Sequence, residues 1–143
     1  IIQAITLPDE FELIYAKSHQ TLSDLTDSEE NYIGWNHAKV GAYYLWNHHI
    51  SENIVEAVNL HNSPHESTID AKLCSAVHLA NRLTRQLGLY GMEKIEEEDK
   101  TEYYNTPAWS LLFPKEDEKS MEEKKQLVEA SMNRLKEIST HIL

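Results

Sequence analysis

The chain contains few of the residues that make tight turns and crosslinks. Glycine and proline occur four times each among 143 residues, and Cys74 is the single cysteine. Few glycines and prolines disfavour a fold built from many tight hairpins. A lone cysteine excludes an internal disulfide and favours a reducing compartment. Because no glycine lies in a Gly-x-Gly context, the glycine-rich nucleotide-binding fingerprints are excluded as well.

Positive charge and long apolar runs are also scarce. Lysine and arginine together number 13 against 24 acidic residues, which gives a formal net charge of −11. Without a basic stripe, nucleic-acid binding is not expected. No apolar run approaches the length of a bilayer span, and residues 1–7 are too short for a signal peptide. We therefore expect a cytoplasmic protein without membrane contact, whose acidic runs at 93–99 and 116–123 are solvated faces.

The residues that are plentiful, leucine, glutamate, lysine and alanine, are good helix formers. Apolar positions recur at spacings of three and four, which indicates amphipathic helices. The sequence predicts an all-α, compact helical bundle that forms a single domain over residues 1–143. Because the chain opens on Ile1 without a methionine, we expect it to be a fragment of a longer protein or a processed product. The predicted helices cover residues 8–19, 28–47, 51–62, 68–87 and 120–143.

Local signals refine the helix ends and the buried faces. Capping-box spacings at 26–30 and at Ser120 with Glu123 predict helix starts. Ser67 or Thr68 is expected to cap the helix at 68–87. A short helix is expected to begin at 106–109. Residues 63–67 and 92–105 are predicted to be loops, the second with one helical turn. The expected inward residues of the two middle helices are Ile54, Ala57 or Val58, His61, Ile69, Leu73, Ala76, Ala80, Leu83 and Leu87.

Eight histidines is a high number for this length, and three of them fall on or beside predicted apolar faces. His37, His61 and His78 lie on successive predicted helices. Helical bundles hold metals through inward side chains, and imidazole is the commonest ligand. A histidine on an apolar face is nevertheless more often a core residue with its hydrogen bonds satisfied. Both interpretations remain open from spacing alone.

Four blocks between residues 30 and 91 resemble one known family. They are Glu30 with Gly34-Trp35; Asn36-His37-Ala38-Lys39-Val40-Gly41-Ala42 with Leu45-Trp46; Leu60-His61-Asn62; and Ala76-Val77-His78-Leu79-Ala80-Asn81-Arg82-Leu83. Their order and spacing resemble the C-terminal half of the HDOD domain, a bacterial regulatory domain. That domain is related to the HD-superfamily metal phosphohydrolases, which are helical bundles. The resemblance implies that His37 takes the position of a metal-binding histidine and His61 that of the first of two paired histidines.

The departures from the family pattern concern the metal ligands. Asn62 stands in place of the second paired histidine, and Asn81 in place of a terminal aspartate. The chain contains neither a His-Asp dipeptide nor Gly-Tyr-Pro. Too few ligands remain to hold a metal and activate a water. The resemblance therefore implies a degenerate pocket at His37, His61, Asn62 and Asn81, with no catalytic residue, metal or cofactor.

These observations favour a non-enzymatic bacterial signal-transduction module that binds a regulatory protein partner or follows an upstream signalling domain. One alternative is an HD-type metal-dependent phosphohydrolase whose His-Asp dyad lies upstream. A second is an oligomerisation domain, in which the terminal helix makes a homo-oligomer.

Three smaller features complete the set of candidates. A local metal site at His61, His65 and Glu66 is a weaker possibility, because its spacing is no known ligand signature. The aromatic residues Trp35, Tyr43, Tyr44 and Trp46 could line a pocket, but large aromatics at helical spacing are more often in the core, where we expect them. Cys74 is expected to be buried and unreactive.

Overall fold

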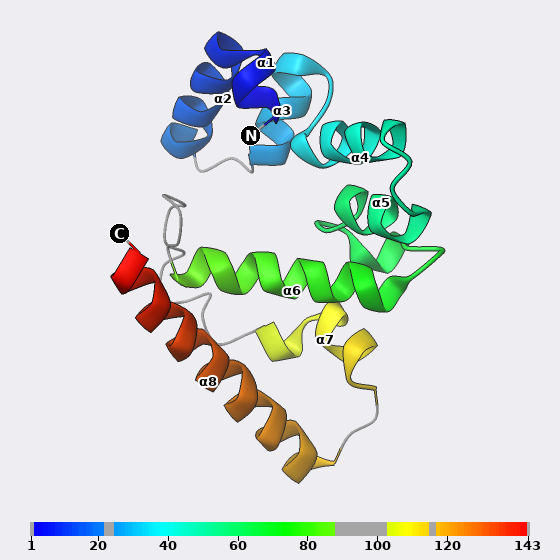
Figure 1. The fold of residues 1–143 in the computed structure, drawn as a ribbon, viewed down its shortest axis with the longest axis vertical. Helices are drawn as coiled ribbons and strands as arrows, with labels where there is room; N and C mark the ends of the chain where they lie inside the picture. Colours follow the sequence, from blue (N-terminus) through cyan, green and yellow to red (C-terminus); the bar gives the residue numbers. More distant parts are fainter. Residues whose placement is uncertain (1, 22–24, 88–102, 115–116, 143) are drawn as a thin grey trace.

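The computed structural model describes residues 2–21, 25–87, 103–114 and 117–142 (Figure 1). Within these ranges every regular element is a helix, which confirms the all-α prediction. The elements in chain order are α1 (Ile2–Thr6), α2 (Pro8–Thr21), α3 (Leu25–Ile33), α4 (His37–Asn47), α5 (Glu52–Asn59), the 3-10 turn η1 (Pro64–Glu66), α6 (Ala71–Leu87), the 3-10 turn η4 (Tyr103–Asn105), α7 (Pro107–Leu112) and α8 (Glu118–Ile142).

The helix predicted over 28–47 is in fact two helices, α3 and α4. Gly34 has a φ of 79°, a left-handed conformation that glycine adopts without steric cost and that commonly ends a helix. Asn36 then caps α4 by accepting a hydrogen bond from the backbone N–H of Lys39 at 2.9 Å. The apolar periodicity continues across this break, and for that reason spacing alone did not show it.

The next two predicted helices are shorter than expected at their ends. The predicted 51–62 helix ends at Asn59, and a 3-10 turn follows at Pro64–Glu66 within the predicted loop. The helix predicted from 68 begins at Ala71, because Asp70, rather than Ser67 or Thr68, accepts the hydrogen bond from the N–H of Leu73 at 3.0 Å. Asp70 therefore has the capping role.

Several expected core residues are on the surface instead. Ala57 is buried as expected, but Ile54 is 44% exposed and Ile69 is 56% exposed. On α6 the buried residues are Cys74, Ser75 and Leu79, while Ala76 and Ala80 are exposed. Helix α6 contacts α5, η1, α7, η4 and α8. Because other elements pack around α6 on several sides, the residues that it buries are not those of its most apolar face.

The C-terminal elements agree better with the sequence. Thr106 caps α7, accepting a hydrogen bond from the N–H of Trp109 at 3.2 Å. The start of α8 is capped by Asp117, which accepts from the N–H of Ser120 at 2.7 Å, so the predicted cap at Ser120 is wrong. Of the loop predicted at 92–105, only the turn η4 lies among the described residues.

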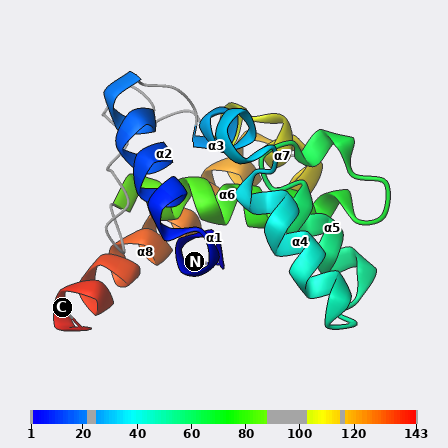
Figure 2. The same cartoon turned by 90° about the horizontal axis from the view of Figure 1, so that it is seen from above.

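Helix α6 runs through the middle of the molecule (Figure 1). The helices α1 to α5 lie on one side of it, and α7 and α8 lie on the other. Helix α8 crosses obliquely to α6, which the view from above also shows (Figure 2). Over the described ranges, none of the helices combines the length and apolarity needed to cross a bilayer.

Candidate functional site

A row of hydrogen-bonded polar side chains joins α3, α4 and the turn that follows α5. Glu29 on α3 is only 1% exposed, and its Oε2 lies 2.6 Å from His37 Nδ1. The other ring nitrogen of His37, Nε2, lies 3.3 Å from His61 Nε2. The structure therefore brings together the two histidines that the sequence placed in one pocket.

The break between α3 and α4 positions this contact. Since Asn36 is the N-cap, His37 is the first residue of α4, and its backbone N–H has no partner within the helix. That N–H donates to Glu29 Oε2 at 2.8 Å. A carboxylate at a helix N-terminus is also stabilised by the helix dipole. One buried carboxylate thus holds both the backbone and the ring of His37.

Gln3 on α1 completes the surroundings of Glu29. The side-chain amide is 4% exposed. In the orientation that satisfies both of its ends, its nitrogen donates to Glu29 Oε1 at 2.7 Å, and its oxygen accepts from the His37 N–H at 3.2 Å. Both carboxylate oxygens of Glu29 are therefore hydrogen-bonded, as a buried charge requires.

The hydrogen-bond partners assign the ring protons. His61 Nδ1 faces the Val58 carbonyl oxygen at 2.7 Å, and because that oxygen can only accept, Nδ1 carries the proton. A neutral His61 then offers a lone pair at Nε2. A hydrogen bond between the two Nε2 atoms consequently needs the donated proton to come from His37 Nε2.

Burial lowers the pKa of His61 below its ordinary value of 6.5, and the charges of His37 and His78 lower it further. The hydrogen bond to the Val58 carbonyl opposes this shift, but the pKa of His61 remains lowered. His78 Nδ1 lies 2.7 Å from the backbone carbonyl of His61. The third inward histidine therefore supports the backbone of His61 rather than its ring.

The two asparagines of the predicted pocket take no part in the hydrogen bonds of the histidine pair, as far as the described residues show. Asn62 is exposed, and its Nδ2 donates to Thr26 Oγ1 at 3.3 Å, so it faces α3. Asn81 is half-buried, three residues beyond His78 on α6. Among the residues that the structure describes, neither asparagine hydrogen-bonds to His37 or His61.

Two members of the site, Glu29 and Gln3, were not found from the sequence. The family pattern pointed to Glu30, but Glu30 Oε1 accepts from Asn36 Nδ2 at 2.6 Å and from Lys39 Nζ at 2.8 Å. These two partners lower the pKa of Glu30. Glu29 lies about one helical turn before the end of α3. Its closeness in sequence to the start of α4 is the one signal that could have identified it. No spacing relates Gln3 to the histidines.

The remaining candidates do not form sites in the described parts of the chain. His65 and Glu66 are 3.8 Å apart, but both are exposed, and they form no metal-binding group with His61. No group of three or more metal-binding side chains comes together there. The aromatics predicted in the core are half or more exposed in three cases, Trp35, Tyr43 and Trp46, and Tyr44 is 49% exposed. Cys74 is buried, as expected.

No protein-family model matches the chain, and neither a curated protein nor a solved structure matches it significantly. The resemblance to the HDOD domain therefore stands on the sequence blocks alone.

Proposed function

We propose that the chain is a non-enzymatic regulatory module of bacterial signal transduction with a degenerate HD-type pocket. The main support for this proposal is the row of side-chain contacts that runs from Glu29 through His37 to His61. Its polar atoms bond to one another and to the protein backbone. A site arranged in this way holds the helices in fixed positions relative to one another. Such rigidity suits a module whose surface is recognised by a partner protein.

The chemistry of the pocket argues against hydrolysis. A hydrolytic zinc centre needs about three protein ligands and an open position for water. Among the described residues, His37 and His61 offer two imidazole nitrogens, and Glu29 is already held by His37 and Gln3. The two asparagines at the family's ligand positions are poor replacements for imidazole and carboxylate.

One observation favours a second candidate, the metal-dependent phosphohydrolase. Two imidazole nitrogens bound to one tetrahedral zinc at 2.0–2.1 Å lie roughly 3.3 Å apart, and the two Nε2 atoms here are 3.3 Å apart. The pair therefore fits half of a metal site, with both rings neutral and Lewis-acid chemistry supplied by the ion. A His-Asp dyad on a preceding segment would have to complete it.

An oligomerisation role is the third candidate, and the exposed apolar residues of α8 favour it. Leu127 is 67% exposed, and Leu135 and Ile138 are each 47% exposed. Sedimentation velocity of the wild-type chain and of Leu135→Glu tests this role. A dimer that dissociates in the variant would move self-association to first place.

Elemental analysis and a hydrolysis assay together test the leading proposal. The protein is dialysed and then assayed against cyclic dinucleotides with added manganese, iron or zinc. We expect no stoichiometric metal and no turnover. Bound metal with turnover that is lost in His37→Ala and His61→Ala, but kept in the exposed-histidine control His65→Ala, would establish the phosphohydrolase instead.

A further inference from the structure

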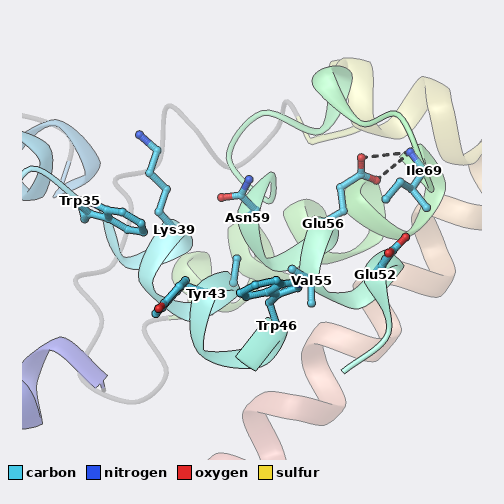
Figure 3. A pocket seen from close by; sticks show the side chains of 10 residues that line it. Trp35, Lys39, Tyr43, Trp46, Glu52, Val55, Glu56, Asn59 and Ile69 are labelled. Atoms are coloured by element: carbon cyan, nitrogen blue, oxygen red, sulfur yellow. Dashed lines mark hydrogen bonds between the residues drawn. The ribbon is translucent and has the colours of Figure 1, made fainter. Parts of the chain in front are cut away.

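An open groove lies between α4 and α5, and neither His37 nor His61 lines it (Figure 3). Its volume is about 510 Å³. The C-terminal half of α4 and the turn before α4 supply its aromatic wall, and α5 supplies its acidic wall. The lining residues that carry the argument are Trp35, Lys39, Tyr43, Trp46, Glu52 and Glu56.

Three large aromatic side chains of this groove are open to solvent. Trp35 is 50% exposed, Tyr43 is 57% exposed and Trp46 is 61% exposed. The Tyr43 ring lies between the two indoles, with centroids 6.1 Å from Trp35 and 6.3 Å from Trp46. Exposed aromatic residues gathered in one patch are typical of protein interaction surfaces.

The packing of α4 explains why these rings face outward. The inner side of α4 consists of small residues, with Ala38 and Ala42 buried. A Cβ added at Gly41 would lie 3.2 Å from Val58 Cγ1, so α5 packs closely against α4 at this point. The close approach leaves no room between the helices for Tyr43 or Trp46, which therefore line the groove.

The charges in the groove leave one carboxylate available. Lys39 Nζ is bonded to Glu30 at 2.8 Å. Glu56 accepts hydrogen bonds from the backbone N–H groups of Thr68, Ile69 and Asp70. The Glu52 carboxylate, in the first turn of α5, makes no hydrogen bond or ion pair with the described residues.

We propose that this groove binds a positively charged, arginine-containing peptide segment of a partner protein. Guanidinium groups stack on tryptophan and tyrosine faces and pair with carboxylates. Exposed indoles that line the same groove as Glu52 therefore match an arginine-containing segment. The inference rests on the proposed role as a partner-binding module, and it gives the chemistry of that partner.

The overall charge disfavours two other occupants. The chain carries a formal net charge of −11. A second copy would meet electrostatic repulsion, and a nucleic acid would meet an acidic surface. A cationic segment instead gains from the long-range attraction of the whole molecule.

Binding is measured with a fluorescein-labelled peptide, Gly-Arg-Gly-Arg-Gly-Arg, by anisotropy in about 0.15 M salt, where long-range attraction is largely screened. The same sequence with glutamate in place of arginine is the charge control. In NMR spectra, the indole N–H signals of Trp35 and Trp46 should shift on binding. The signal of Trp109, which is 1% exposed, serves as the internal reference and should stay in place.

Matched variants separate the groove from general charge attraction. Trp46→Ala should weaken binding about tenfold, a loss typical of a cation–π contact together with its packing. Tyr43→Ala should weaken it about threefold, whereas its neighbour Tyr44→Ala, whose ring lies 4.3 Å from His48 outside the groove, should leave it unchanged.

Two matched glutamate variants, Glu52→Gln and its control Glu118→Gln, test the acidic wall of the groove. Both residues are exposed glutamates in the first turn of a helix, but only Glu52 lines the groove. A loss in Glu52→Gln alone supports the proposal. Equal losses in both variants, unshifted Trp35 and Trp46 signals, or a dimer that dissociates in Trp46→Ala would each overturn it. Metal-dependent hydrolysis would instead overturn the proposed function, and it is measured separately at His37 and His61.

Discussion

The molecule has two buried clusters on opposite sides of α6, and they differ in chemistry. The C-terminal cluster is apolar and consists of Leu79, Tyr103, Ala108 and Trp109. The N-terminal cluster buries Gln3, Glu29 and Asn36 around the histidine pair. One half of the chain is organised by apolar burial, and the other by a hydrogen-bonded charge.

The two kinds of cluster contribute differently to the fold. Apolar burial stabilises a fold in rough proportion to the area removed from water and tolerates many arrangements. A buried carboxylate costs free energy unless every oxygen is paired, so it is compatible with few arrangements. We infer that the apolar cluster supplies most of the stability, while the polar cluster defines the relation of α1, α3, α4 and α5.

The largest expected effect is the loss of Trp109. The Trp109 ring lies 5.5 Å from Tyr103 and 4.5 Å from Phe113, and it is 1% exposed. Trp109→Ala should reduce the free energy of unfolding by about 3–5 kcal/mol, the usual cost of removing a buried large ring. Trp46→Ala, at a 61% exposed position, should change it by only about 0.5 kcal/mol. Urea denaturation measures both, and similar losses would contradict the division of roles.

The adjacent residues Glu29 and Glu30 test the polar cluster. Glu29→Gln removes the charge facing His37 and leaves a buried donor mismatched, so we expect a loss of about 2 kcal/mol. Glu30→Gln, at an exposed ion pair with Lys39, should cost about 0.5 kcal/mol or less. If the two variants lose the same stability, the buried carboxylate has no special role.

The contrast between the clusters also explains what the sequence could predict. Thr106 followed by Pro107 marked the start of α7, and apolar spacing marked α8, because local signals determine such elements. The break at Gly34 was missed because apolar periodicity runs through it, and a glycine inside a helical pattern is not by itself a stop signal. The exposed aromatics of α4 were assigned to the core because periodicity does not show that Gly41 brings α5 close.

The site was predictable only in part, for a similar reason. His37 and His61 follow helical spacing and a family pattern, and they do meet. Gln3 reaches them from a helix that lies more than 30 residues away in sequence, so only tertiary packing places it. The choice of Glu29 over Glu30 depends on which side of α3 faces α4, and a two-residue acidic run does not encode that.

Glu56 joins α5 to the segment that leads into α6, the helix between the two clusters. Its hydrogen bonds from Ser67 and from the backbone N–H groups lower its pKa to about 2 from an ordinary 4.5. The unfolded chain therefore binds more protons between those values, and stability falls as the pH drops from about 4.5 towards 2. Glu56→Gln should be less stable at neutral pH and should lack this part of the acid dependence. Parallel acid titrations by circular dichroism test it, and identical curves for both proteins would contradict the link.

The smallest expected effect is the pH dependence that His61 contributes near neutrality. Burial lowers its pKa in the folded protein below 6.5, so below about pH 6.5 the unfolded chain takes up a proton that the folded chain resists. Stability should therefore fall as the pH drops below 6.5 and stop falling below the folded pKa. His61→Asn keeps a donor for the Val58 carbonyl but cannot titrate, and it should lose this dependence, whereas His65→Asn at an exposed position should retain it.

Urea denaturation at pH 8 and at pH 5.5 measures this difference for the wild type and both variants. Glu29, His37 and His78 also surround His61, so the informative quantity is the change between the two pH values in each variant relative to the wild type. If His61→Asn and the wild type lose equal stability on acidification, His61 is not the neutral partner of the pair. The proton between the two rings would then belong to His61, and His37 would be the acceptor.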